Sequence, residues 1–153
     1  MKKLYLIILT LFTIISNSQN IFPEKFNNCS TEEMSLESDS VYTETNTRNL
    51  RKLIKSNLSK EKKQNLKGVL SIQIVVNLDG SSCLISFKND TNLKSSELNL
   101  KNIIDSNLKW KKPKEIVSPI ILFNFSEENV SYKRIGINGK KGNHLIEEKT
   151  FYN

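Results

Sequence analysis

Alternating hydrophobic and polar positions between residues 69 and 88 predict a β-hairpin. Asp79-Gly80 interrupts the alternation, and this pair favours a two-residue type I′ turn because both turn residues need positive φ. The resulting register places apolar residues together on one face: Ile72 with Phe87, Ile74 with Ile85, and Val76 with Cys83. The other face pairs Gln73 with Ser86 and is largely polar, so we expect a charged substitution at Gln73 to have a mild effect.

Two amphipathic helices are predicted, one on each side of the hairpin in the sequence. The first can be capped by Thr47 and the second by Ser95 or Ser96. Their apolar stripes are Leu50, Leu53, Ile54 and Leu58 in the first helix, and Leu100, Ile103, Ile104 and Leu108 in the second. Trp110 follows as an expected packing anchor, and Pro113 stops the second helix.

A compact apolar segment from Ile120 to Phe125 predicts a third strand. Pro119 must lie at its start or on an edge, because proline cannot donate a hydrogen bond to a neighbouring strand. These elements predict an α+β fold: a three-stranded antiparallel sheet in the order 2-1-3, with two helices packed on one face. Residues 126–153 form a tail in which Val130 to Ile137 alternate and Asn138-Gly139 indicates a turn, so an extra C-terminal strand or hairpin is also expected.

The N-terminal part of the chain is typical of an exported protein. Lys2 and Lys3 precede an apolar run from Leu4 to Ile15, and Ser16-Asn-Ser18 resembles a cleavage site. The run is shorter than the roughly 20 apolar residues that span a bilayer, so we expect cleavage near Ser18 and no stable membrane span afterwards. The predicted organisation is a signal peptide at 1–18, an irregular leader at 19–46, a domain at 47–125 and the tail. The expected location is periplasmic or secreted.

Cys29 and Cys83 are the two cysteines of the chain. An oxidising compartment permits a disulfide between them. The predicted register points Cys83 into the core, where an unpaired thiol behaves as a small hydrophobic group. A Cys29–Cys83 disulfide and two unpaired thiols therefore both remain open.

Charge and motifs give little indication of chemistry. The formal net charge is +7, but no basic stripe interleaved with aromatic residues is present, so nucleic-acid binding is not expected. The sequence contains no glycine-rich phosphate loop, no paired-histidine metal motif and no nucleophile elbow. His144 is the single histidine and has no identifiable partner in the sequence. We therefore expect no enzymatic activity, no cofactor and no metal.

The order of helix, hairpin with an Asp-Gly turn, helix, tryptophan, proline and strand resembles the TonB C-terminal domain family. The similarity is carried by Gly68 to Gly80 (GVLSIQIVVNLDG), Leu108-Lys-Trp110, Pro113, and the strand Ile120 to Phe125. The chain departs from the family, which usually has Trp-x-Pro, at Trp110-Lys-Lys-Pro113. We also expect this chain to lack the uncleaved membrane helix and the proline-rich linker of energy-transducing members.

In that family the last strand offers an edge to which a short extended segment of a receptor adds as another strand. By position, the resemblance implies that this edge consists of Ile120, Ile121, Leu122, Phe123, Asn124 and Phe125. It implies an exported module that binds a protein partner, such as an outer-membrane receptor segment in transport, or dimerises through the same edge. The alternative is a secreted structural or accessory domain whose edge is closed by its own tail, Val130 to Ile137, with no role in energy transduction.

Overall fold

The computed structural model describes residues 20–45, 47–138 and 142–152. The predicted signal peptide, residues 1–18, and Gly139 of the predicted turn lie outside these ranges. The described elements are β1 (Glu24–Lys25), β2 (Ser35–Leu36), α2 (Thr47–Ser56), α3 (Lys60–Asn65), β3 (Gly68–Val76), β4 (Ser82–Thr91), α4 (Ser95–Leu98), α5 (Leu100–Asn107), β5 (Val117–Ser118), β6 (Ile120–Phe125), β7 (Asn129–Asn138) and β8 (Gly142–Tyr152).

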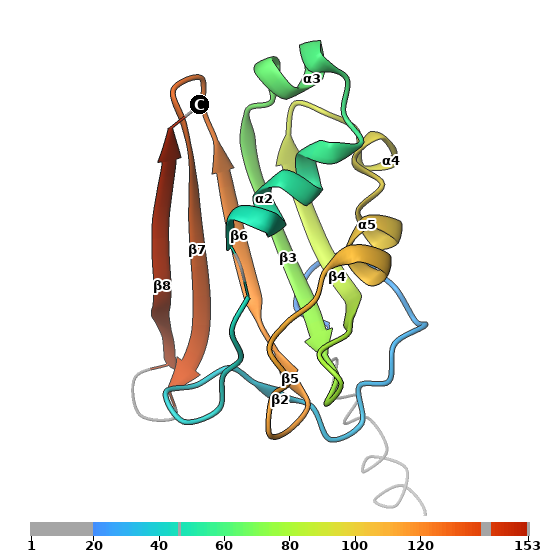
Figure 1. Ribbon diagram of the computed structural model, residues 1–153, viewed down its shortest axis with the longest axis vertical. Helices are drawn as coiled ribbons and strands as arrows, with labels where there is room; N and C mark the ends of the chain where they lie inside the picture. The colour runs from blue at the N-terminus through green and yellow to red at the C-terminus, as the bar shows by residue number, and fades with distance from the viewer. Residues whose placement is uncertain (1–19, 46, 139–141, 153) are drawn as a thin grey trace, which may run out of the picture.

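One large sheet dominates the α+β structure. Its strand order is β1-β4-β3-β6-β7-β8, and the short β5 pairs with both β3 and β2. The helices lie in front of β3, β4 and β6, whereas β7 and β8 extend the sheet beyond them (Figure 1). The prediction of a three-stranded sheet is therefore wrong, because the described sheet has eight strands. The leader and the tail, which were predicted to lie outside the domain at 47–125, supply the strands at the two ends of the sheet.

The β3–β4 hairpin follows the predicted register only away from its turn. Ser71 lies opposite Lys88 and Gln73 opposite Ser86, but a bulge then shifts the pairing by one residue. The loop closes through the Gly80 N–H, which donates to the Asn77 carbonyl at 2.8 Å, and Gly80 has a φ of +82°. These features are typical of a three-residue loop that ends in a left-handed glycine. The predicted two-residue turn is wrong, and Cys83 consequently lies opposite Val75 rather than Val76.

The hydrophobic core lies between the helices and the sheet. It contains the predicted helix stripe residues Leu50, Ile54, Leu100 and Ile104, and sheet residues such as Ile72, Ile74, Leu84, Ile121 and Phe123. Trp110 belongs to this cluster and is 6% exposed, and its indole N–H donates to the Ser82 hydroxyl at 2.9 Å. The predicted role of Trp110 as a packing anchor is confirmed.

The second face of the hairpin is buried as well. Gln73 is fully buried. Its side-chain oxygen accepts hydrogen bonds from the Ile21 N–H at 2.8 Å and from the Ser86 hydroxyl at 2.7 Å. Its amide donates to the Ser118 hydroxyl at 3.2 Å. The expectation that a charge at Gln73 is tolerated therefore does not agree with the structure: the leader covers this face, and a buried charge would lose its hydration.

Candidate interaction site

The strand that the sequence predicts as a binding edge is an interior strand. β6 pairs with β3 on one side, from Gln73 opposite Ile120 to Gly68 opposite Phe125. On its other side β7 pairs along the whole strand, from Ile120 opposite Ile135 to Phe125 opposite Val130. The candidate residues Ile120, Ile121, Leu122, Phe123, Asn124 and Phe125 therefore have no free edge to offer a partner.

The β7 strand closes this edge because its inward side chains complete the core. Val130 and Tyr132 are fully buried. The ring of Tyr132 lies 5.4 Å from the ring of Phe123, which faces it across the two strands. Burial raises the pKa of the Tyr132 hydroxyl above its usual value, although the neighbouring Arg134 acts in the opposite direction. The alternation from Val130 to Ile137 therefore corresponds to a strand that covers β6.

The free edge of the sheet is β8, not the predicted strand β6. This strand pairs with β7 from Tyr152 opposite Asn129 to Gly142 opposite Asn138, and within the described residues no strand lies on its other side. Leu145 and Tyr152 on β8 are 51% and 80% exposed. The outer side of β8, a strand of 11 residues, therefore has no neighbouring strand among the described residues.

Charges and a bulge limit what can pair with this edge. Glu148 binds Lys133 at 3.1 Å, and Glu147 forms an ion pair with Lys149. A register shift opposite Arg134 and Ile135 interrupts the β7–β8 ladder. Proteins commonly use charged side chains and bulges to prevent indiscriminate pairing at sheet edges. The β8 edge therefore suits a selective partner better than general association.

The opposite end of the sheet is held by the leader. β1 pairs with β4 through Glu24 opposite Phe87 and Lys25 opposite Ser86. The next residue, Phe26, stacks on Phe87 with ring centroids 5.8 Å apart. The leader thus occupies part of the β4 edge, whereas β8 carries no such cover among the described residues.

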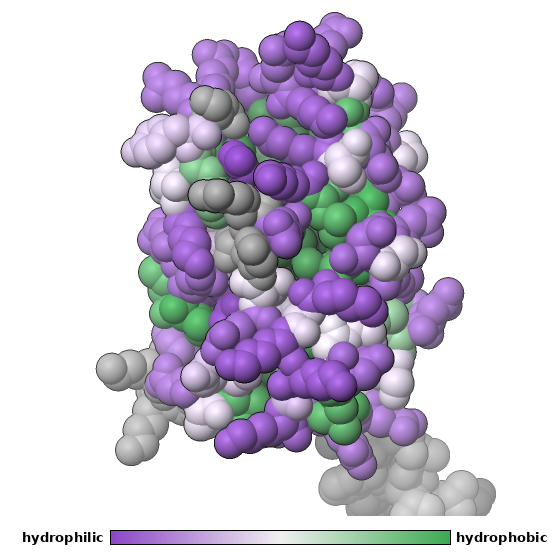
Figure 2. Space-filling view, viewed as in Figure 1, coloured by the Kyte–Doolittle hydropathy of each residue, from purple (hydrophilic) through white to green (hydrophobic). Residues whose placement is uncertain are grey.

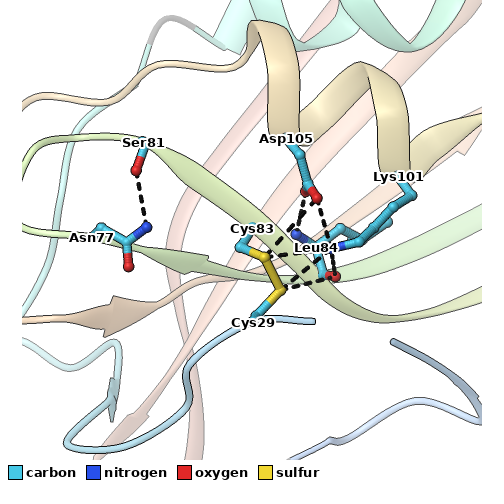
Figure 3. Close-up of a disulfide and its surroundings, with 7 residues drawn as sticks. All are labelled: Cys29, Asn77, Ser81, Cys83, Leu84, Lys101 and Asp105. Atoms are coloured by element: carbon cyan, nitrogen blue, oxygen red, sulfur yellow. Dashed lines mark hydrogen bonds and ion pairs between the residues drawn. A yellow bond between two sulfur atoms is a disulfide. The ribbon is translucent and has the colours of Figure 1, made fainter. Parts of the chain in front are cut away.

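A disulfide between Cys29 and Cys83 fixes the leader to β4 (Figure 3). Of the two alternatives left open by the sequence, the structure contains the disulfide and no free thiol among the described residues. The Lys101 ammonium lies 3.3 Å from each sulfur atom and 2.6 Å from the Asp105 carboxylate, which also accepts the Leu84 N–H at 2.7 Å. This bridge joins the leader, β4 and α5, and it is consistent with an extracytoplasmic protein.

A basic groove lies beside the C-terminal end of β8. Its volume is about 610 Å³, and it is lined by Arg51, Lys52, Lys55, Ser56, Lys63, Gln64, Glu127 and Tyr152. Hydrophilic side chains predominate at the top of the molecule, where α3 lies (Figure 2). Partial burial, together with the neighbouring Arg51, lowers the pKa of Lys55. Positive charge is therefore concentrated next to one end of the open edge.

A buried ion pair joins the leader to β7. Glu37 is fully buried and Arg134 is 5% exposed, and the guanidinium Nε lies 3.0 Å from the Glu37 carboxylate. The carboxylate also accepts the Thr43 N–H at 3.2 Å. Burial raises the pKa of Glu37, although Arg134 and the Thr43 N–H act in the opposite direction. This pair was not predicted from the sequence, although Arg134 shares its face of the alternating segment with Val130 and Tyr132, and a charge on an inward face needs a buried partner.

His144, the single histidine of the chain, lies beside a carboxylate of the leader. His144 lies 2.8 Å from the Asp39 carboxylate, at the end of the sheet where the leader crosses. Across residues 20–45, 47–138 and 142–152, no group of three or more His, Cys, Asp or Glu residues could hold a metal ion. In the same ranges, no helix has the length and apolar character needed to cross a membrane.

Comparisons with known proteins return no match: no family model, no curated protein and no solved structure is significantly similar to this chain. The resemblance to the TonB C-terminal domain family therefore stays a prediction. The open β8 edge and the groove beside it are the features on which a function can be argued.

Proposed function

We propose that this protein is an exported protein-protein interaction domain that binds an extended segment of its partner by strand addition along β8. The open outer side of β8 is the observation that carries this proposal. In such complexes the backbone hydrogen bonds supply affinity, and side chains on alternate positions supply selectivity. The disulfide and the predicted signal peptide support an extracytoplasmic setting. The family resemblance extends the proposal to a periplasmic role with an outer-membrane partner.

A second candidate is a secreted structural or accessory domain that binds no strand. Its support is the closure of β6 by the chain's own β7, which removes the edge that the family resemblance implies. In this case β8 is only the end of the sheet, and its charges serve to keep it unpaired. The two candidates differ in whether the outer N–H groups of β8 ever acquire a partner.

The test pans a phage-displayed library of random decapeptides against the purified, oxidised protein. We expect selected peptides rich in β-branched and aromatic residues, and NMR amide exchange should show new protection along β8 when a synthetic copy binds. Protection confined to other elements, or no selected peptide at all, would overturn strand addition and favour the second candidate.

Two neighbouring proline variants, Glu148→Pro and Lys149→Pro, provide a matched pair. Successive N–H groups of a strand point to opposite sides. The Asn129 carbonyl and the Ile137 N–H form hydrogen bonds away from β8, so Tyr132 directs its backbone groups toward β8, where it lies opposite Lys149. Lys149→Pro therefore removes an N–H that faces β7, and Glu148→Pro removes one that faces outward. Lys149→Pro should be destabilised. Glu148→Pro should remain folded and lose peptide binding, and equal binding by folded Glu148→Pro would argue against strand addition.

A further inference from the structure

The basic groove is continuous with the proposed binding edge. Tyr152, the last described residue of β8, also lines the groove, together with cations from both α2 and α3. A strand that pairs with the C-terminal half of β8 therefore ends near Tyr152, the residue that β8 shares with the groove. Side chains at that end of the added strand are therefore the ones that can contact the groove.

The electrostatic balance of the groove favours an anion. Four cations line it, and Glu127 is the one carboxylate among the described lining residues. Glu127 already forms an ion pair with Lys67, and this contact lowers the pKa of Glu127. Lys55 loses hydration through partial burial and is repelled by Arg51. A negative group in the groove would offset both of these unfavourable effects.

Aromatic rings hold two of the cations in place. The Arg51 guanidinium lies over the Phe151 ring at 4.9 Å from its centroid, and the Lys55 ammonium lies over the Phe125 ring at 5.9 Å. Such contacts reduce the conformational freedom that a ligand would otherwise have to remove. The arrangement is therefore partly organised for binding before any ligand arrives.

The α3 helix contributes charge to the groove and nothing to the core. It has no buried residue, and it is held by its Ser59 cap, which accepts the Lys62 N–H at 3.3 Å, and by the buried Leu66 at its end. Its Lys63 and Gln64 line the groove. An ion pair between Lys62 and Glu97 at 2.6 Å also holds α3 in place, so Lys63 reaches the groove from an anchored helix.

We propose that the partner segment carries two or more carboxylate side chains at the end that lies beside Tyr152, and that the groove formed by α2 and α3 binds them. This inference rests on the proposed strand addition and specifies its partner chemistry. A peptide carboxylate is favoured over a free phosphate because the groove adjoins the open backbone edge, so one chain can occupy both.

The test repeats the library panning with a groove variant and a matched control. The groove variant combines Arg51→Gln, Lys55→Gln and Lys63→Gln, and the control removes equal charge elsewhere through Lys109→Gln, Lys112→Gln and Lys114→Gln, three exposed lysines. Wild type and control should select peptides with two or more Asp or Glu residues at one end. The groove variant should still select strand-forming peptides but without this acidic end. Thermal denaturation checks that both variants remain folded.

A synthetic peptide and its Asn/Gln counterpart measure the contribution of the carboxylates. The acidic form should bind wild type about tenfold more tightly, the effect expected of two exposed ion pairs, and added salt should reduce the difference. NMR titration of the Lys55 side chain should show its pKa rising when the acidic peptide binds, and the groove variant should bind both peptides equally.

Each outcome decides a different claim. Selected peptides without an acidic end, or an acidic preference that survives in the groove variant, would overturn this inference while leaving strand addition intact. Binding of inorganic pyrophosphate at the groove as tight as that of the acidic peptide would assign the groove to phosphate instead. A failure of every peptide to protect β8 would overturn the proposed function itself.

Discussion

The disulfide gives the strongest prediction for stability. We consider the double variant Cys29→Ala/Cys83→Ala, which removes the bridge without leaving a thiol. The two cysteines are separated by 54 residues, so the bridge closes a long loop in the unfolded chain. Their loss frees that loop, and the unfolded state gains conformational entropy that the native state does not.

The chain-entropy relation for a loop of this length gives a loss of about 4 kcal/mol at room temperature. A domain of this size loses about 4 °C in melting temperature for each kcal/mol, so the melting temperature should fall by roughly 15 °C. The Lys101–Asp105 pair and the Leu84 N–H bond to Asp105 remain possible without the sulfur atoms. The loss should therefore come mainly from the unfolded state.

Urea denaturation of the wild type, the reduced wild type and the double variant measures this effect. The reduced wild type serves as the control, because it loses the bridge but keeps both side chains, and it should match the double variant within about 1 kcal/mol. A loss below about 1 kcal/mol in both proteins would refute the loop-closure reasoning. A biphasic transition in either would show that the leader detaches separately from the rest of the sheet.

Two further predictions concern buried polar groups. Burial raises the pKa of Glu37 above its ordinary value of 4.5. The folded protein therefore binds the carboxyl proton of Glu37 more tightly than the unfolded chain does. As the pH rises from the ordinary pKa through the pKa of the folded state, this contribution to stability is lost. Urea titrations from about pH 4 to about pH 7 should show the wild type losing stability relative to Glu37→Gln, and an unchanged difference would contradict the raised pKa. Gln73→Ala should cost about 1 to 3 kcal/mol, because the Ser86 hydroxyl and the Ile21 N–H lose their buried acceptor. Urea denaturation measures this cost, and amide exchange should show faster exchange at Ile21; normal protection there would argue against the Gln73 contact.

Local patterns in the sequence were sufficient for the centre of the fold. The alternation around Ile72 and Gln73 determines the register of the hairpin, because a slip of one residue would exchange its two faces. The pattern did not fix the turn. Asp79-Gly80 suits a two-residue loop, but a three-residue loop with Gly80 in the left-handed position uses the same residues and requires a compensating bulge. In the structure the Gly80 carbonyl accepts the Trp110 N–H at 2.9 Å, a contact with a distant segment that the local pattern does not contain.

The ends of the sheet could not be predicted from local pattern. β1, β2 and β5 have two residues each, which is too short for any periodicity to be visible. Gln73 looked exposed because a polar residue on an alternating strand usually faces water, and only the position of the leader shows that it is buried. The candidate edge was misplaced for the same reason: the sequence suggested that the tail covers β6, but it did not show that β8 would become the new edge.

The position of the leader has a consequence for the order in which the chain can fold. Phe26 contacts β4 near Phe87, and Glu37 contacts β7, where its carbonyl accepts the Ile137 N–H at 2.7 Å. The N-terminal segment therefore finds its place only after strands from the middle and the far end of the sequence have been made. Contacts between such distant residues slow folding, because the entropy cost of closing a long loop comes before the stabilising contact forms. We therefore expect folding to be limited by the closure of these long loops, with the leader as the last part of the sheet to dock.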